Sequence, residues 1–460
     1  MVAAILPGIV LASLLTLHAH PGEDYYWGLA NGQWMLHHHR VLTHNVFSYA
    51  LGHQPIVVTE WGFEILMGIL HHLGGMAAVR ALDVGAAALS TALVLVYARI
   101  RGAATSTLIW LSPVVGLLLA PELVQGRALS VGFGFFALEL ILLDRARRDA
   151  RWLWLVGPLL ALWVNLHGSA LLGLGALVVE AAISLSGTRW PWLGDRSGHW
   201  RPRVGAVIWG VLWIGLTPWG WGLAYYDYRL SSNARIAQYI AEWASPSFHS
   251  LGPWLILAGP VIVLVRSLWG RPHSATETAL LVLVLVAALR SFRMADYATV
   301  LMAGGVGAWA SGRVAIPWGR TRLGAVWAGA LAALTIIGVS NAAPQTAGTY
   351  VPVAAFRTLD TMASGRLLTT YAWGGYGLLD GRRAFVYGET DLFTGGSGRT
   401  FDQLVSLMFL TKDPEPLLDA YRVRYVLWEP GQALSVYLAA SSHWRVVSRS
   451  ARYVLFERQA

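Results

Sequence analysis

The sequence predicts an all-α polytopic membrane protein with about 11 transmembrane helices, followed by a small extracytoplasmic α/β domain. Three observations lead to this fold class. The 460 residues are 55% hydrophobic and only 13% charged, whereas soluble domains carry about 25% charged residues. Apolar runs long enough to approach the 20 or so residues of a bilayer span recur along positions 1–341. Beyond them, short apolar runs alternate with turn residues.

The expected spans follow these apolar runs. The run at the N-terminus resembles a signal peptide, but it lacks a basic start and a small-residue cleavage site, so we expect a retained helix. Two other stretches, 24–38 and 60–73, are amphipathic and are expected to lie at the membrane interface. The spans are expected at 2–17, 77–98, 105–120, 128–144, 152–166, 168–187, 204–219, 251–270, 276–290, 295–311 and 323–341.

Arginines set the expected orientation in the membrane. The net charge is +9, and Lys412 is the only lysine. Arginines gather in alternate loops, and cytoplasmic loops are the ones enriched in basic residues. We therefore expect a protein of the plasma (inner) membrane with a cytoplasmic N-terminus, an extracytoplasmic C-terminus and a long first outer loop, 18–76. Because topology accounts for the charge, no nucleic-acid partner is expected. The absence of cysteine excludes disulfides and thiolate metal sites.

The segment 342–460 is expected to form a separate extracytoplasmic domain after the transmembrane domain, 1–341. Its short β-rich runs and turn residues indicate strands, and two apolar pieces between them indicate helices. Strands are expected at 366–371, 384–387, 425–429 and 452–457, and helices at 417–421 and 434–440.

Unusual polar side chains collect in the loops that are expected outside. An ionisable group beside lipid is costly, so each one is a candidate for function. Transfer of a sugar from a polyprenyl phosphate fits them, because the acceptor hydroxyl needs a carboxylate base. The leaving phosphate needs an arginine or a metal ion. The candidate catalytic residues are Asp24 and Glu60, and the candidate substrate contacts are Trp27, Trp61, Arg127, Asn165, His167, Glu242, Arg290 and Arg293.

Histidine is abundant in the first outer loop, where His37, His38 and His39 stand in a row. Adjacent residues of a helix point in different directions. Interfacial imidazoles are therefore a simpler interpretation than a metal site. A divalent cation is compatible with the chemistry, but the sequence does not support one, and the metal ligands stay unknown.

Several motifs together resemble a family of bacterial multi-pass membrane proteins of the GT-C superfamily. The resemblance covers nearly the whole chain. It implies a GT-C fold and an inverting glycosyltransferase that uses a polyprenyl-phosphate sugar, membrane lipid and an acceptor glycan, lipid or protein. It also implies a catalytic acid at Asp24. The motifs are Asp24-Tyr-Tyr-Trp27, Phe47-Ser48-Tyr49, Glu60-Trp61, Trp163-Val-Asn165-Leu-His167-Gly168, Thr217-Pro-Trp-Gly220, Glu242-Trp243-Ala-Ser-Pro246, Arg290-Ser-Phe-Arg293, Trp373-Gly-Gly-Tyr376 and Gly388-Glu-Thr-Asp391-Leu-Phe393.

The chain departs from that family at three positions. Gly28 and Thr59 stand where the family has histidine, and Asn45 stands where it has aspartate. These losses weaken a metal site and leave open whether this member is active.

Two other functions remain open at this stage. A transporter or flippase of lipid-linked glycans would carry polar residues through the bilayer midplane and internal repeats, and neither is visible. A polymerase or ligase of lipid-linked glycans would use arginines in a large outer loop, and the loop 220–250 carries Arg229 and Arg235.

Overall fold

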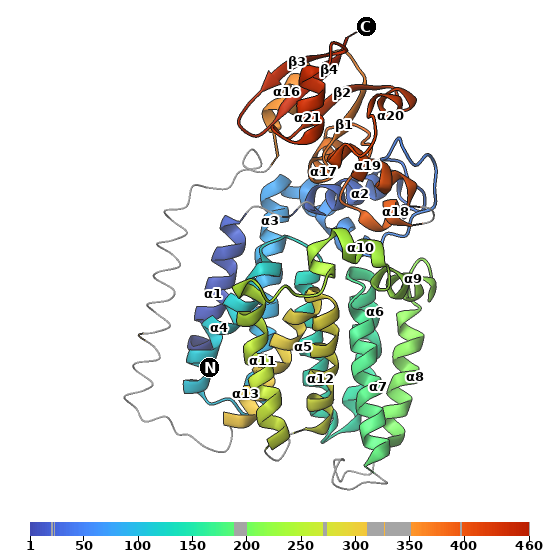
Figure 1. The fold of residues 1–460 in the computed structure, drawn as a ribbon. Coiled ribbons are helices and arrows are strands. Elements are labelled where there is room, and N and C mark those ends of the chain that lie inside the picture. Colours follow the sequence, from blue (N-terminus) through green and yellow to red (C-terminus); the bar gives the residue numbers. More distant parts are fainter. Residues whose placement is uncertain are drawn as a thin grey trace. The chain divides into compact units, whose positions relative to one another are not determined.

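The computed structural model describes residues 1–19, 22, 24–187, 200–269, 274–310, 326, 351–395 and 398–459. The expected span 323–341 lies outside these residues. The chain divides into two compact units, which we call the helical unit and the mixed unit (Figure 1). The helical unit comprises Met1–Ala19, Thr59–Phe63 and Leu73–Ala343, and the mixed unit comprises His20–Val58, Glu64–His72 and Pro344–Ala460.

The helical unit has a helix at each expected span within the described residues. Three helices, Trp61–Ile100, Thr105–Leu123 and Leu251–Trp269, are long and apolar enough to cross a membrane. Val2–His18, Ala150–Leu166 and Ala170–Ser186 are shorter apolar helices. The elements are α1 (Val2–His18), α3 (Trp61–Ile100), α4 (Thr105–Leu123), α5 (Leu129–Ala146), η1 (Ala150–Leu155), α6 (Val156–Leu166), α7 (Ala170–Ser186), α8 (Trp200–Ile214), α9 (Gly222–Ser231), α10 (Ala234–Tyr239), η2 (Ala241–Trp243), α11 (Leu251–Trp269), α12 (Ala275–Arg290), η3 (Phe292–Met294) and α13 (Ala295–Ala310).

Helix α3 is interrupted at two adjacent glycines. Gly74 has φ −151°, and Gly75 has φ +62°, a left-handed conformation that a glycine adopts without steric cost. The interruption separates the piece that begins at Trp61 from the long helix that ends at Ile100. The expected stretches 60–73 and 77–98 thus lie on either side of this break, joined within one element, and the interfacial position of 60–73 stays a prediction.

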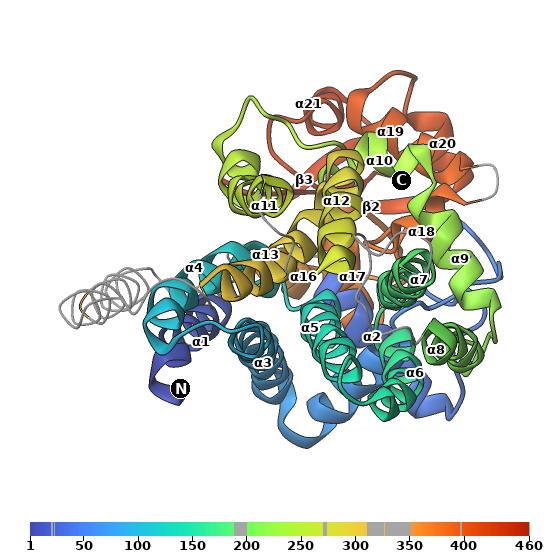
Figure 2. The same cartoon turned by 90° about the horizontal axis from the view of Figure 1, so that it is seen from below.

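Close helix contacts in the helical unit depend on small residues. Helices α1 and α4 lie side by side (Figure 2). A Cβ atom on Gly8 would lie 2.1 Å from the carbonyl oxygen of Ser112, and one on Gly116 would lie 2.6 Å from that of Gly8. The backbone N–H of Gly8 donates to Ser112 Oγ at 2.7 Å. Small residues let helix backbones approach in this way where lipid gives little hydrophobic drive between helices.

A buried ion pair joins three other helices of this unit. Arg203 of α8 donates to Glu180 of α7 at 2.8 Å, and the Thr276 hydroxyl of α12 donates to the same carboxylate at 2.5 Å. All three residues are buried. Each polar group thus has a partner in surroundings where an unsatisfied one would cost several kcal/mol, on the order of 2–7.

The mixed unit is built on a four-stranded sheet of order β1-β2-β4-β3 (Figure 1). Strand β1 (Arg366–Thr369) pairs parallel with β2 (Val423–Trp428), and β4 (Val454–Arg458) pairs antiparallel with β2 and β3 (Trp444–Arg449). The helices are α2 (Asp24–His38), α16 (Val353–Asp360), α17 (Tyr371–Leu379), α18 (Thr390–Thr394), α19 (Arg399–Phe409), α20 (Glu415–Ala420) and α21 (Ala433–Ala440).

The expected strands near 366, 425 and 452 and both expected helices are present. The expected strand 384–387 is wrong. Ala384 forms only an isolated bridge with Ser48, because that stretch pairs with the loop that contains Ser48 rather than with the sheet. Strand β3 was not predicted, since its burial pattern is largely exposed and the strand carries Arg445 and Ser448.

The Phe47-Ser48-Tyr49 motif attaches the segment between α2 and α3 to the rest of the mixed unit. The N–H of Tyr49 donates to the Ala384 carbonyl at 3.0 Å, and Ser48 Oγ donates to the Phe385 carbonyl at 2.7 Å. Asn45 holds the turn, because its Nδ2 donates to Ser48 O at 2.9 Å while its Oδ1 accepts from the Ser48 N–H at 2.9 Å. An ionised aspartate has no donor for the first of these bonds. The departure at position 45 therefore has a structural reason.

Candidate functional site

Five polar residues that are far apart in the sequence meet in loops of the helical unit. We call them the arginine–histidine cluster. Each stands at a helix end: Glu60 precedes α3, Arg127 lies before α5, His167 joins α6 to α7, Glu242 lies in η2 and Arg293 in η3. Helix ends carry backbone groups without helical partners, so they are natural places for polar side chains.

The turn between α6 and α7 positions the cluster. Trp61 Nε1 donates to Asn165 Oδ1 at 2.9 Å, and Asn165 Nδ2 donates to the carbonyls of Ala161 at 2.7 Å and Leu216 at 2.9 Å. A Cβ on Gly62 would lie 2.6 Å from the Asn165 carbonyl oxygen, so only glycine permits this approach. The start of α3, and Glu60 with it, is thereby held on the turn.

The hydrogen bonds around His167 define its tautomer. The backbone N–H of Ser169 donates to Nδ1 at 3.1 Å, so Nδ1 is an acceptor and carries no hydrogen. Burial, followed by the charges of Arg293 and Arg127, holds the pKa of His167 well below its usual range. The ring is therefore neutral, and we assign its hydrogen to Nε2. Glu60 Oε1 lies 3.3 Å from Nε2 and accepts this hydrogen.

Glu242 is shared by both arginines of the cluster. Arg127 Nη1 donates to Oε2 at 2.6 Å, and Arg293 Nη1 lies 3.6 Å from Oε1. Burial alone would raise the pKa of Glu242, but Arg293 and Arg127 outweigh it and hold the pKa below its usual range. Glu242 is therefore ionised, and one negative charge faces two positive charges.

The guanidinium of Arg293 has only long contacts with the polar groups of the cluster. Its distance of 3.6 Å from Glu242 is too long for a hydrogen bond. Nη2 lies 3.3 Å from His167 Nε2, which already carries a hydrogen and cannot accept one. The group is held instead over the ring of Trp243, 5.0 Å from its centre. Arg293 thus retains N–H groups for an anion, whereas Arg127 forms a short bond to Glu242.

A second group of polar residues lies in the mixed unit, and we call it the carboxylate cluster: Asp24, Asn31, Glu64, Glu389 and Asp391. Asn31 Nδ2 donates to Glu64 Oε1 at 3.3 Å, and the Tyr387 hydroxyl donates to Glu389 Oε2 at 2.9 Å. Burial, then the charge of Asp391, raises the pKa of Glu389 well above its usual range. Asp24 also acts on Glu389 electrostatically.

Asp24 stands in the first turn of α2, where the helix dipole favours a negative charge. Its Oδ1 accepts a hydrogen bond from Trp27 Nε1 at 3.0 Å. The Gly388-Glu389 segment approaches this pair closely, since a Cβ on Gly388 would lie 2.3 Å from Trp27 Nε1 and 3.1 Å from Asp24 Oδ1. The two sequence motifs that contain Asp24 and Glu389 thus lie together within one unit.

The described residues offer no group of three or more His, Asp or Glu side chains that converges as metal ligands do. Even the carboxylate cluster lacks such a group.

The structure brings most of the predicted substrate contacts together. Trp61, Arg127, Asn165, His167, Glu242 and Arg293 join Glu60 in the helical unit. Trp27 joins Asp24 in the mixed unit. Arg290 is exposed at the last residue of α12 and has no place in the network of the described residues. Sequence reasoning missed Asn31, Glu64 and Glu389 as partners, although the Gly388-Glu-Thr-Asp391 motif was a signal for the last.

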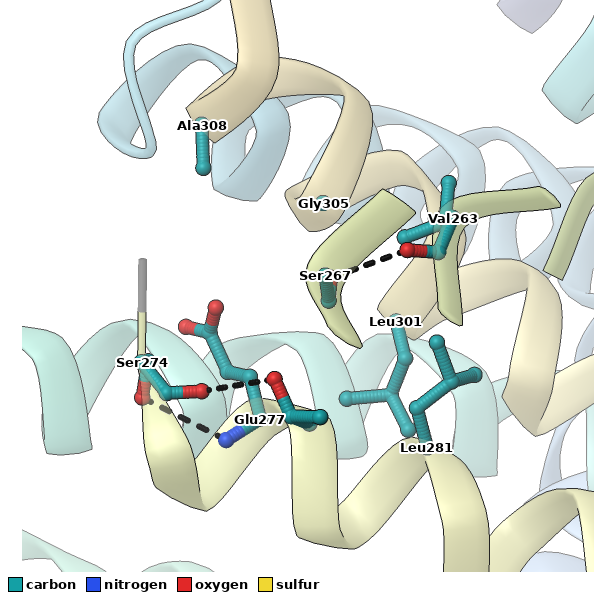
Figure 3. Close-up of a pocket in the computed structure, with 9 residues that line it drawn as sticks. Val263, Ser267, Ser274, Glu277, Leu281, Leu301, Gly305 and Ala308 are labelled. Atoms are coloured by element: carbon teal, nitrogen blue, oxygen red, sulfur yellow. Dashed lines mark hydrogen bonds between the residues drawn. The ribbon is translucent and has the colours of Figure 1, made fainter. Parts of the chain in front are cut away.

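A small cavity at the other end of α12 is not a candidate site. It lies between α11, α12 and α13 and holds about 20 Å³, which is near the volume that admits one water molecule (Figure 3). Its polar groups bond within the protein: Ser267 donates to the Val263 carbonyl at 2.8 Å, and Glu277 pairs with Arg101 at 2.8 Å.

The chain shares its overall fold with solved structures of two other membrane proteins. AglB, an archaeal oligosaccharyltransferase from Archaeoglobus fulgidus solved with an inhibitory peptide and a dolichol-phosphate, shares the fold with a TM-score of 0.61 and 12% identity, over 92% of this chain and 69% of that one. ArnT from Cupriavidus metallidurans, solved with undecaprenyl phosphate, shares it with a TM-score of 0.55 and 14% identity, over 99% of this chain and 97% of that one. No protein-family model matches the sequence, and no curated protein matches it.

Proposed function

We propose that the protein is a multi-pass membrane glycosyltransferase that moves a sugar from a polyprenyl phosphate to an extracytoplasmic acceptor. The arginine–histidine cluster is the observation that carries the proposal. It offers a half-buried guanidinium with N–H groups to spare, Arg293, beside a carboxylate that a neutral histidine orients, Glu60. The shared fold supports the proposal, because AglB was solved with a dolichol-phosphate and ArnT with undecaprenyl phosphate.

The proposed reaction is a single displacement at the anomeric carbon. The acceptor oxygen forms a bond to this carbon while the bond from the carbon to the phosphate oxygen breaks. The electron pair leaves with the polyprenyl phosphate, and the acceptor proton passes to a carboxylate. One displacement inverts the configuration of the sugar. An arginine offsets charge on the departing phosphate, and charge-assisted hydrogen bonds to phosphate are the strong kind.

Asp24 is the proposed base, and Glu60 is the alternative. Asp24 stands at the start of α2, and its Oδ1 accepts the bond from Trp27, so the carboxyl group is held in a defined position. Glu60 is also placed to accept one, with His167 holding Oε1. As an alternative role, Glu60 orients the acceptor.

Purified protein in detergent or vesicles tests the function directly. We would incubate it with radiolabelled polyprenyl-phosphate sugars and follow the release of polyprenyl phosphate and the transfer of label to cell-envelope acceptors. Transfer that depends on the protein and is lost in Arg293→Ala supports the proposal. Movement of intact donor across vesicle membranes without cleavage of the sugar–phosphate bond would indicate a flippase instead.

A further inference from the structure

A cavity of about 190 Å³ lies within the mixed unit, at the start of strand β1. Its wall combines the first outer loop, at Tyr49, with the C-terminal segment, at Ser364–Leu367 and Arg382–Arg383. At roughly 30 Å³ per water, this volume is room for about six waters, so it exceeds what a single small ion needs. Neither Arg366, Arg382 nor Arg383 is used by the proposed transfer reaction.

Three guanidinium groups and no carboxylate line this cavity. Arg366 Nη1 donates to the Tyr421 carbonyl at 2.8 Å, and Arg383 Nη2 donates to the Ser48 carbonyl at 3.1 Å. Carbonyls are neutral, so these bonds position the two arginines without cancelling their charge. Arg382 is different, because it pairs with Asp360 at 2.6 Å.

The cavity is built to keep its arginines in place. The Arg366 guanidinium stacks 5.2 Å from the centre of the Tyr49 ring, and the Tyr49 hydroxyl donates to the Leu367 carbonyl at 3.0 Å. Arg382 Nε is buried without a hydrogen-bond partner among the described residues. A buried donor of this kind is unfavourable until something accepts a hydrogen bond from it.

We propose that this cavity binds a sugar that carries a phosphate or a carboxylate. One planar guanidinium group can donate to two oxygens of a phosphate or a carboxylate at once, so a cavity with three guanidinium groups suits such an anion. The volume beyond the anion admits the attached sugar ring, and the Ser364 hydroxyl and the backbone of Gly365 are polar surfaces for its hydroxyls. As part of the proposed function, the cavity would hold an anionic residue of the acceptor glycan; binding alone does not depend on that function.

Binding by the full-length protein in detergent tests the proposal without any transfer assay. Glucose 1-phosphate, glucuronate and neutral glucose would be titrated separately by calorimetry. We expect glucose 1-phosphate, glucuronate or both to bind, with an affinity that falls as salt rises, and glucose not to bind. Preference for one of the two anions identifies the charged group.

Single variants then place the binding in this cavity. Arg383→Gln and Arg366→Gln should each weaken binding about 10- to 100-fold. Arg449→Gln, an exposed arginine of β3 outside the cavity, is the matched control and should bind as the wild type does. Arg383 is exposed and donates to the Ser48 carbonyl rather than to a carboxylate, so its loss should leave the thermal unfolding temperature unchanged.

The proposal is overturned if neither anionic sugar binds, if glucose binds equally well, or if both cavity variants bind like Arg449→Gln. Loss of transfer with intact binding would instead count against the proposed function alone. If Arg383→Gln still transfers sugar but has a raised KM for an anionic acceptor, the cavity takes part in binding the acceptor of the proposed reaction.

Discussion

Nε2 of His167 lies 3.3 Å from Oε1 of Glu60. The two residues are more than 100 positions apart, and each belongs to a short motif with a neighbouring tryptophan or glycine. Ser169 occupies the other ring nitrogen, so the histidine has one hydrogen to give and Glu60 receives it. His167 is therefore a positioning residue for the carboxylate in this structure.

Removing the His167 donor should slow transfer. His167→Phe leaves Glu60 without this bond, and a hydrogen bond to a charged group contributes about 1.5–3 kcal/mol. We expect kcat to fall about 10- to 100-fold with little change in the KM for the donor. His72→Phe, at an exposed position, is the control. Equal kcat values for the two variants would remove the positioning role.

Arg293 is expected to contact the donor phosphate. Arg293→Ala should weaken donor binding by about 10- to 100-fold, the size of a lost charge-assisted bond. Arg293→Lys keeps the charge but loses the planar fork, so it should recover only part of the affinity. Binding of a labelled polyprenyl phosphate to the purified variants measures this. Wild-type affinity in both variants would contradict the assignment.

Arg229→Ala is the matched control for that experiment, and it also distinguishes the proposed glycosyltransferase from a polymerase or ligase. Arg229 is exposed in α9, in the long loop that favoured a polymerase or ligase. We expect donor binding and transfer to be unchanged in this variant. A loss there, with Arg293→Ala unaffected, would favour the polymerase or ligase.

Glu389 should make stability depend on pH. Burial and Asp391 raise its pKa, so above its ordinary value the unfolded chain releases a proton that the folded chain keeps. Stability is full below that ordinary value and falls as the pH rises toward the raised pKa. Above about pH 4, the unfolding temperature of the wild type should therefore fall with rising pH relative to that of Glu389→Gln. Glu429→Gln, which is exposed, should follow the wild type. Parallel profiles for wild type and Glu389→Gln would show that Glu389 does not titrate in this way.

The alternating arginine loops predict opposite compartments for two points of the chain. Reporter fusions after residues 150 and 350 should place the first in the cytoplasm and the second outside. The loop around Asp24 should share the outer side with the C-terminus. Both fusions reporting one compartment would overturn this topology.

The helices were predictable because apolar length is a strong signal. Each expected span in the described part of the chain coincides with a helix, and the segment 60–73 was separated correctly from 77–98. The sheet was harder to predict. Strand β3 is half solvent-exposed and carries no clear alternation, whereas the apolar stretch 384–387 bonds to residues of the distant first loop. Local pattern does not report such long-range pairing.

The candidate site was predictable only as residue types at one membrane face. The rule that charge near lipid is costly selected Glu60, His167, Glu242 and Arg293, and the structure joins them. The same rule also selected Arg290, which does not join the cluster because its side chain is exposed at the end of a helix. It did not reveal that Asn31 bonds to Glu64, because that contact depends on how two helices pack.

Two variants can identify the general base. Asp24→Asn keeps the size of the side chain and can still accept the bond from Trp27, but it loses the basic oxygen. Loss of a general base costs about 10²–10⁴-fold in rate. We expect this loss in kcat for Asp24→Asn, with donor binding retained. Glu60→Gln should cost less, about 10- to 100-fold, if Glu60 orients the acceptor.

Both variants need proof of correct folding before their rates are compared. Glu60→Gln retains an oxygen that accepts the hydrogen of His167 Nε2, so the turn at His167 should persist. Unfolding temperatures and donor binding equal to those of the wild type would confirm that each site is intact. Under these conditions, wild-type turnover by Asp24→Asn together with a collapse of turnover in Glu60→Gln would assign the base to Glu60 and refute the assignment to Asp24.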